Sequence, residues 1–277
     1  MSERKARIAA LLARLKIEAN APIPRERIPF VFNDTAVGHL LKKDALFLAE
    51  RFRFFSLDRG ALRFVAENPA QATRRLAAVS QIFKAQDRVF AWRDELLPVV
   101  PLNDYGRTTI FAFIERAMCR PFAFSTFAVH LNPFTSDGRL WVGQRSFKKA
   151  IGPGYWDNCA AGMAPLNEPF LTAMQREAYE EAGIEPGSLE FHFCARHLIS
   201  RPVHEGWMRE HTILFSALVP EDFLPHNVDG EVECFELMTP EEILTQIEKG
   251  RFTFESSLSI LVGLAAQEGM PTELDSY

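Results

Sequence analysis

Residues 162–184 read GMAPLNEPFLTAMQREAYEEAGI, and this stretch decides the fold of the second half of the chain. Asn167 is a good helix N-cap, Pro169 is tolerated in a first turn, and Gly183 suits the position after a last turn. These signals predict a helix over residues 168–182. The apolar residues at helical spacing predict one stripe that packs on a sheet. They are Leu171, Met174, Ala178 and Ala182.

Three glutamates occupy another face of this expected helix. Glu177 and Glu181 are four residues apart and Glu180 is three residues after Glu177, so their carboxylates crowd together. Like charges this close repel each other, and we expect a cation between them. Clustered carboxylates without a soft ligand suit a hard divalent cation such as Mg²⁺. Arg176 can reach Glu180 and Glu168, and would orient the carboxylates that hold the metal.

The fixed positions of this segment resemble the Nudix box, G-x5-E-x7-R-E-U-x-E-E-x-G-U, where U is an apolar residue. The match holds at Gly162, Glu168, Arg176, Glu177, Glu180, Glu181 and Gly183, with apolar Ala178 and Ile184. A solvated acidic helix face is the usual meaning of such a charge run. The glycines, the arginine and Glu168 at their required spacings favour the motif over that alternative.

The resemblance implies an α/β fold, a Nudix α/β/α sandwich with a mixed sheet, that hydrolyses diphosphates linked to another moiety, X. It implies that Glu177, Glu180 and Glu181 bind the metal, that a backbone carbonyl near Gly162 adds a ligand, and that Arg176 and Glu168 position the carboxylates. The implied cofactor is Mg²⁺, for which Mn²⁺ can substitute.

The resemblance also implies a general base, because water must attack phosphorus. Family members use either a box glutamate, which is Glu177 here, or a glutamate from a loop outside the box. The acidic turn at residues 229–233 offers Glu231 and Glu233. The sequence leaves this choice open.

The flanks of the box resemble the Nudix subgroup related to thiamine pyrophosphokinase, which has an additional N-terminal domain. The matching segments are 92–96, 113–117, 130–132, 140–146, 152–158, 222–225, 229–233 and 250–252. The subgroup implies hydrolysis of thiamine diphosphate, or of its oxidised or damaged analogues, to the monophosphate and phosphate.

Basic and aromatic residues near the box fit a substrate of this kind. Arg145, Lys148 and Lys149 form a cationic cluster suited to a diphosphate tail, and Trp156 is able to stack on a heteroaromatic ring. The alternatives are a solvated basic loop and an ordinary core tryptophan.

The pattern along the chain predicts two domains: a smaller α+β domain at 1–120 and the Nudix domain at 121–277. The first has expected helices at 1–20, 68–84 and 108–118, a strand at 29–32 and a hairpin of 53–57 with 61–65. After Pro121 the expected strands are 126–131, 139–144, 156–161, 189–198, 211–219 and 232–237, with a helix from Pro240 to about Lys249.

Composition narrows the class of protein. The chain has 277 residues, 47% of them hydrophobic and 24% charged, with a net charge of −5, as in a globular protein that binds neither nucleic acid nor anionic membrane. No apolar run reaches the roughly 18–20 residues of a membrane span. The four cysteines lack zinc or redox spacing and predict buried thiols in the cytoplasm. Residues 1–20 are expected to form an ordinary first helix, and an organelle transit peptide is the alternative interpretation of the same residues.

The expected partner is a small-molecule diphosphate, and the oligomeric state, a homodimer included, is left open. Three other functions compete. The moiety X can be a nucleoside, as in ADP-ribose, NADH, a nucleotide sugar or an oxidised nucleotide. A non-catalytic ligand sensor would not need three clustered carboxylates. Isomerisation of an isoprenyl diphosphate is associated with altered boxes.

Overall fold

The computed structural model describes residues 2–104, 109–165 and 168–272, and their contacts form two compact units. The first comprises Met1–Ala19, Phe127–Leu198 and Thr212–Tyr277, and the second Asn20–Thr126 and Ile199–His211. Each unit therefore takes segments from both sides of Pro121. The division at 1–120 and 121–277 stays a prediction.

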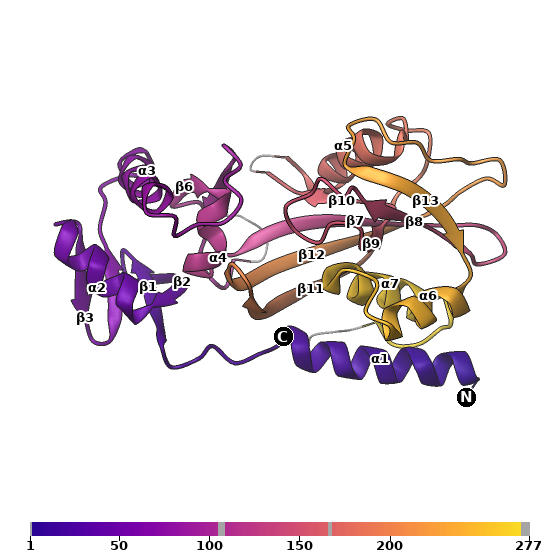
Figure 1. Ribbon diagram of the computed structural model, residues 1–277, viewed down its shortest axis with the longest axis horizontal. Helices are drawn as coiled ribbons and strands as arrows, with labels where there is room; N and C mark the ends of the chain where they lie inside the picture. The colour runs from indigo at the N-terminus through magenta and orange to yellow at the C-terminus, as the bar shows by residue number, and fades with distance from the viewer. Residues whose placement is uncertain (1, 105–108, 166–167, 273–277) are drawn as a thin grey trace. The chain divides into compact units, whose positions relative to one another are not determined.

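The first unit is built on a seven-stranded sheet of order β11-β12-β7-β8-β13, in which β10 also pairs with β7 and β9 with β8 (Figure 1). The strands are β7 (Thr126–Phe134), β8 (Leu140–Arg145), β9 (Trp156–Asn158), β10 (Ala160–Met163), β11 (His192–Val203), β12 (Gly206–Leu218) and β13 (Val232–Met238). Strands β7 and β8 pair directly at Phe134 and Leu140, and β10 and β9 pair with them farther along. The expected strands are thus present, and β11 and β12 are longer than predicted.

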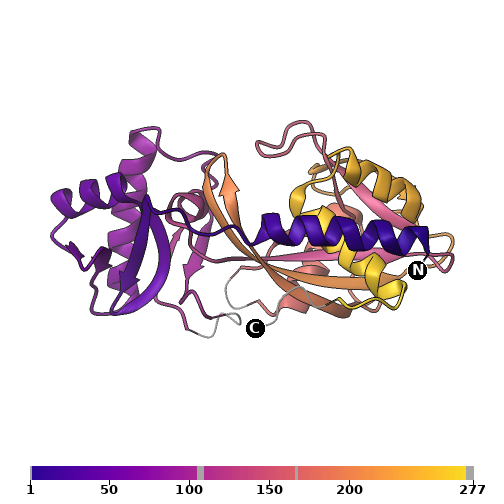
Figure 2. The same ribbon diagram turned by 90° about the horizontal axis from the view of Figure 1, so that it is seen from below.

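Helices cover both faces of this sheet, so the expected α/β/α arrangement is confirmed. Helix α5 (Phe170–Ala182) lies on one face, and α1 (Glu3–Ala19), α6 (Pro240–Glu248) and α7 (Phe254–Gln267) lie on the other (Figure 1). Helix α1 runs along α7 and α6, as Figure 2 shows. Its buried side is the predicted apolar stripe, which includes Ile8, Leu11, Leu12 and Leu15.

Helix α7 was not expected. All ten residues from Ser256 to Ala265 are buried, so the helix has no polar face to reveal its period.

The start of α5 differs from the sequence prediction. The helix begins at Phe170 rather than residue 168, because Pro169 is extended, at φ −54° and ψ 144°, and a residue that precedes proline avoids the helical region. Pro169 holds the N-cap position, and the predicted cap Asn167 lies outside the described residues. The end is as predicted, since Gly183 adopts the left-handed conformation and donates to Tyr179 O.

The apolar stripe of α5 was partly wrong. Met174, Ala178 and Ala182 are buried, but Leu171 is 44% exposed and Ala173 takes its place in the core.

The second unit holds a four-stranded sheet of order β2-β1-β4-β3 and a two-stranded sheet of β5 with β6. Its elements are β1 (Arg27–Phe32), β2 (Thr35–Leu41), α2 (Lys42–Arg51), β3 (Phe55–Asp58), β4 (Ala61–Phe64), α3 (Pro69–Ala85), β5 (Leu96–Val99), β6 (Ala112–Glu115), the 3₁₀ turn η1 (Arg116–Met118) and α4 (Cys119–Phe122). The helix predicted at 108–118 is wrong, because Ala112–Glu115 pairs as a strand with Leu96–Val99.

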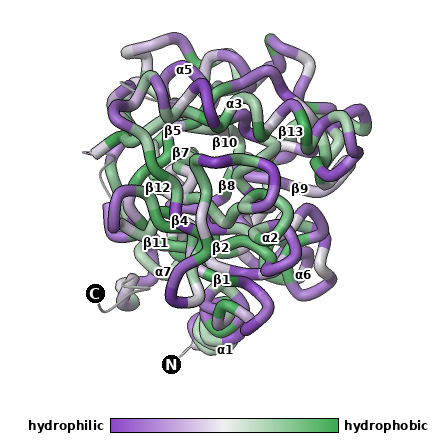
Figure 3. Tube along the Cα trace, turned by 90° about the vertical axis from the view of Figure 1, so that its left-hand side faces the viewer, coloured by the Kyte–Doolittle hydropathy of each residue, from purple (hydrophilic) through white to green (hydrophobic). Residues whose placement is uncertain are grey.

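Phenylalanine packing forms the core of the second unit. The ring of Phe30 lies 5.3–5.9 Å from those of Phe55, Phe64, Phe122 and Phe124. Such contacts between aromatic rings stabilise a core beyond the effect of buried area. In both units the hydrophobic residues follow the strands, and the outlying loops are largely hydrophilic (Figure 3).

Two sequence predictions about the environment can be compared with the structure. Among the described residues, no helix is both long enough and apolar enough to cross a membrane. All four cysteines are free, but only Cys119 and Cys159 are buried; Cys194 is half-buried and Cys234 is exposed.

Candidate active site

The close approach of Gly162 and Glu177 fixes the geometry of the site. Gly162 lies in β10, beneath α5, and a Cβ atom added to it would lie 2.0 Å from Cδ of Glu177. No side chain fits there without displacing the carboxylate. The glycine at this position of the motif therefore makes room for the glutamate.

Arg176 holds three of the glutamates together. Its Nη1 donates to Glu177 at 2.8 Å and to Glu180 at 3.0 Å, and its Nη2 donates to Glu168 at 3.1 Å. The same Nη2 donates to the backbone carbonyl of Met163 at 3.1 Å, which ties the guanidinium to β10. The expected orienting contacts of Arg176 with Glu168 and Glu180 are present.

Glu181 points into the protein, unlike Glu180. Its residue is 5% exposed, and its Oε2 accepts from the backbone N–H of Ala161 at 2.8 Å. Burial raises the pKa of Glu181 to about 8, although Lys149 and the Ala161 N–H act in the opposite direction. Burial also raises the pKa of Glu177, against the effect of Arg176. Both carboxylates therefore lie where an added positive charge would be stabilising.

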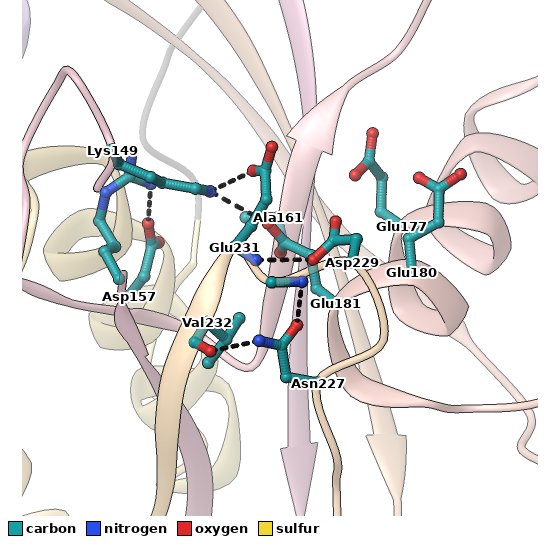
Figure 4. Close-up of polar contacts among 12 residues, drawn as sticks. Lys149, Asp157, Ala161, Glu177, Glu180, Glu181, Asn227, Asp229, Glu231 and Val232 are labelled. Atoms are coloured by element: carbon teal, nitrogen blue, oxygen red, sulfur yellow. Dashed lines mark hydrogen bonds and ion pairs between the residues drawn. The ribbon is translucent and has the colours of Figure 1, made fainter. Parts of the chain in front are cut away.

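Lys149 supplies a positive charge at this site. Its ammonium lies 3.3 Å from Glu181 Oε1 and 2.5 Å from Glu231 Oε2, between the two carboxylates (Figure 4). Burial lowers the pKa of Lys149, but Glu181 and Glu231 outweigh that effect and the pKa is raised. The sequence placed Lys149 in a basic cluster but did not show that it faces the acidic residues.

The carboxylates fit a hard divalent cation in their chemistry, though not as a preformed cage. Glu177 and Glu180 project side by side from α5, while Glu181 and Glu231 meet Lys149 (Figure 4). Across residues 2–104, 109–165 and 168–272, no three His, Cys, Asp or Glu side chains are arranged as a ready-made metal site. Arg176 and Lys149 hold the carboxylates by ion pairs instead. Oxygen-only donors that already attract cations are the kind that Mg²⁺ uses.

The acidic turn before β13 is anchored to the C-terminal end of α5. The backbone N–H of Asp229 donates to the carbonyl of Glu180 at 3.1 Å, and Asp229 accepts from the N–H of Glu231 at 2.8 Å. Asn227 also closes the turn, by accepting from Gly230 N–H at 2.9 Å. The side chain of Glu231 is 55% exposed, so it can reach solvent as well as Lys149. The other loop candidate, Glu233, is exposed on β13.

Arg145 organises the loop between β8 and β9. It pairs with the carboxylate of Asp157 at 2.7 Å and donates to the carbonyls of Gly152 and Ile151 at 3.1 and 2.9 Å. Burial opposes ionisation of Asp157, but Arg145, His130 and Ser256 together hold its pKa below the usual value. Arg145 therefore has a structural task in addition to any contact with substrate.

Of the other two predicted substrate-binding residues, Lys148 lies on the same loop and Trp156 begins β9. Lys148 is exposed beside Lys149, and Trp156 is half-buried. The backbone of Trp156 bonds to Arg251 and Thr253, and this fixes the end of the loop.

A buried polar network under the site was not expected. His130 Nδ1 lies 2.8 Å from Asn158, whose Nδ2 donates to Asn132 at 2.6 Å, and Ser259 of α7 donates to Asn158 at 3.0 Å. Such buried groups require partners, and here strands β7 and β9 and helix α7 provide most of them, although Nε2 of His130 has no hydrogen-bond partner among the described residues. Residues this far apart in sequence carry no local signal of their contact.

Comparison with known proteins agrees with this geometry. The model of the NUDIX domain family matches residues 125–257, which include the glycine, the arginine and all the glutamates described above. An isopentenyl-diphosphate Delta-isomerase of Leifsonia xyli subsp. xyli is 30% identical over 146 residues, which cover 52% of this chain and 77% of the isomerase. The chain belongs to the Nudix family. Nudix enzymes generally use divalent metal ions.

The likeness to some Nudix relatives extends beyond the domain itself. Nudix hydrolase 20, chloroplastic, of Arabidopsis thaliana is 28% identical over 252 residues, which cover 86% of this chain and 66% of the plant protein. Nudix hydrolase 24, chloroplastic, of the same plant is 28% identical over 273 residues, which cover 91% of this chain and 72% of that protein. The chain thus spans about two thirds of their length.

A solved structure supports the fold. DR0079 of Deinococcus radiodurans superimposes with a TM-score of 0.50 at 22% identity, covering 60% of this chain and 97% of that protein. This likeness concerns the fold alone.

Proposed function

We propose that this protein is a Mg²⁺-dependent Nudix pyrophosphohydrolase that cleaves a phosphoanhydride bond of a small-molecule diphosphate. The observation that carries the proposal is the carboxylate of Glu177 above Gly162, oriented by Arg176 together with Glu168 and Glu180. A fixed arrangement of acids on one helix end is costly to maintain unless it serves a charged ligand. The proposed partner is a small molecule and not a nucleic acid, in agreement with the net charge of −5.

In this proposal Glu177, Glu180 and Glu181 hold the metal, together with the backbone near Gly162. A bound divalent cation would supply Lewis-acid stabilisation of the phosphate oxygens and would lower the pKa of water. Arg176 and Glu168 keep the carboxylates in place. Glu231 is the proposed base because its side chain is 55% exposed and shares Lys149 with the buried carboxylate of Glu181. Glu177 is the alternative base.

For the substrate we propose thiamine diphosphate or its oxidised or damaged analogues. The likeness to two plant Nudix hydrolases over 86% and 91% of this chain supports a shared N-terminal region, as in the thiamine pyrophosphokinase-related subgroup. Arg145, Lys148 and Lys149 would face the diphosphate, and Trp156 would lie near the ring. Nucleoside diphosphate derivatives are the alternative substrates.

The test is release of phosphate and monophosphate in Mg²⁺ from thiamine diphosphate, oxidised thiamine diphosphate, ADP-ribose, NADH and 8-oxo-dGTP. Turnover of the thiamine compounds that is lost in Glu177→Gln and Glu181→Gln supports the proposal. Turnover confined to nucleotides overturns thiamine diphosphate as the substrate but leaves the proposed pyrophosphohydrolase reaction intact. If no diphosphate is cleaved with Mg²⁺ or Mn²⁺, a non-catalytic sensor becomes the better explanation.

A second candidate is isomerisation of an isoprenyl diphosphate, favoured by the 30% identity to the Leifsonia isomerase. The complete Nudix box favours hydrolysis. Incubation with isopentenyl diphosphate separates the two, because an isomerase rearranges the double bond without releasing phosphate.

We further propose that the protein works in the cytoplasm. Its four cysteines are all free thiols, which suits a reducing compartment. The two plant relatives are named as chloroplastic, so an organelle is the alternative location. Imaging of a tagged chain in cells distinguishes the cytoplasm from an organelle.

A further inference from the structure

A cavity of about 410 Å³ opens in the first unit beside the N-terminal end of α5. It is lined by Phe170 of α5, Phe193 and Arg196 of β11, and Ile213 and Phe215 of β12. Three of these five side chains are phenyl rings, and Phe193 is 63% exposed. The rings of Phe193 and Phe215 meet edge to face, with centroids 6.2 Å apart. Small-molecule sites are typically apolar hollows of this size with few polar groups.

The cavity lies on the same side of α5 as the catalytic carboxylates. Phe170 is seven residues before Glu177 and eleven before Glu181. At 100° per residue these separations bring all three side chains within roughly 20° of one line along the helix. Seven residues of helix advance about 10 Å. A diphosphate held at Glu177 and joined by a short linker to a ring can therefore reach the cavity.

We propose that this cavity, rather than the neighbourhood of Trp156, binds the ring of the moiety X, and that the ring is planar, aromatic and uncharged. Phenyl walls favour planar rings, which stack or meet them edge to face. Arg196 is the charged residue of the lining, and its guanidinium disfavours a cationic ring while it stacks well on a neutral one. For thiamine diphosphate the neutral pyrimidine would enter, and the cationic thiazolium would remain outside. This inference rests on the proposed function, since it assumes that a diphosphate lies at Glu177.

The experiment compares kinetic constants of Phe193→Ala and Phe193→Tyr for two kinds of substrate. One kind carries a ring, such as thiamine diphosphate or ADP-ribose, and the other, methyl diphosphate, has none. Because stacking of one ring on an aromatic side chain changes affinity by roughly tenfold, Phe193→Ala should raise KM about tenfold for ring-bearing substrates only. We expect kcat to change less than twofold, and Phe193→Tyr to retain the KM of the natural protein. Leu218→Ala is the control, since Leu218 is 65% exposed on β12 and outside the cavity lining.

The outcomes separate this inference from the proposed function. Hydrolysis that continues in Phe193→Ala with unchanged KM for ring-bearing substrates overturns the ring site and leaves the hydrolase proposal intact. An equal rise in KM for methyl diphosphate overturns it too. If the natural protein cleaves no diphosphate, calorimetric binding of thiamine monophosphate and AMP tests the cavity directly. Binding that is lost in Phe193→Ala then supports the ring site, and binding that is absent or unchanged overturns it.

Discussion

The ammonium group of Lys149 lies 3.3 Å from the buried carboxylate of Glu181. The two residues are 32 positions apart, on the loop after β8 and on α5. Removing a carboxylate from water is unfavourable unless partners compensate for the lost hydration, and Lys149 is the charged partner beside the Ala161 N–H. The same lysine contacts Glu231 at 2.5 Å, so one cation links the helix to the acidic turn. A metal at this site would share or replace this role of Lys149.

Replacing Lys149 by methionine should destabilise the protein mainly when no metal is present. We expect a loss of about 2 kcal/mol in EDTA, or a fall in Tm of roughly 5 °C, because Glu181 is left buried without its cation. Mg²⁺ should restore much of that loss. Thermal unfolding of both proteins in EDTA and in Mg²⁺ measures the effect.

Lys148→Met is the matched control, since Lys148 is the exposed neighbour. It should change stability by less than about 0.5 kcal/mol. An equal loss for Lys149→Met in EDTA and in Mg²⁺ would contradict the idea that metal and lysine compensate for the same charge.

Alanine at position 162 should displace Glu177 without unfolding the domain. Its Cβ would lie 2.0 Å from the Glu177 carboxyl carbon, so the side chain must move away. We expect Mg²⁺ affinity and kcat each to fall by roughly 10–100-fold. Titration calorimetry with Mg²⁺ and the phosphate-release assay measure these changes.

Gly143→Ala provides the comparison for this substitution. Gly143 is also in the sheet, but its Cβ would meet Val232 Cγ1 at 3.3 Å, which needs a small shift of one methyl group. This variant should keep the Mg²⁺ affinity of the natural protein. Similar losses in both variants would mean that sheet distortion, and not contact with Glu177, is the cause.

Arg176→Lys keeps the charge but removes the planar fork. A lysine ammonium cannot contact Glu168, Glu177 and Glu180 in the geometry that the guanidinium provides. We expect kcat to fall by roughly 10–100-fold while circular dichroism stays unchanged. Arg139→Lys, at an exposed pair with Asp137, should leave kcat unchanged. Full activity in Arg176→Lys would show that charge alone is enough.

The sequence predicts those parts of the site in which the contacting residues are close together in the chain. It does not predict contacts between residues that are far apart in the chain. The spacing from Gly162 to Gly183 predicted the helix, its end and the role of Arg176, because those contacts lie within one helix and the strand before it. The helix start was less predictable, since Pro169 moves it by two residues. Leu171 fits the period of a buried stripe, yet its side chain is 44% exposed and Ala173, two residues later, is buried instead.

Long-range contacts explain the rest of the difference. Lys149 reads as a solvated loop residue until the fold brings it to Glu181. The cavity of Phe170, Phe193 and Phe215 joins three elements, and a phenylalanine in a sequence is more simply assigned to the core. Neither feature has a spacing rule that the sequence can display.

Buried His197 should make the protein less stable in acid. It is 1% exposed on β11, and among the described residues neither ring nitrogen has a hydrogen-bond partner. Burial, with a smaller effect of His130, lowers the pKa of His197 to about 3 from its ordinary 6.5. Below pH 6.5 His197 is therefore protonated in the unfolded chain but stays neutral in the folded chain. The free energy of unfolding falls progressively as the pH decreases from 6.5 toward 3. At about pH 5 this loss should be about 2 kcal/mol.

Urea unfolding between about pH 5 and 7.5 measures this effect. His197→Phe should lose less stability in acid than the natural protein. His192 is an exposed histidine on the same strand, and His192→Phe should lose as much stability as the natural protein. Parallel stability curves for His197→Phe and the natural protein would assign the acid sensitivity to other groups.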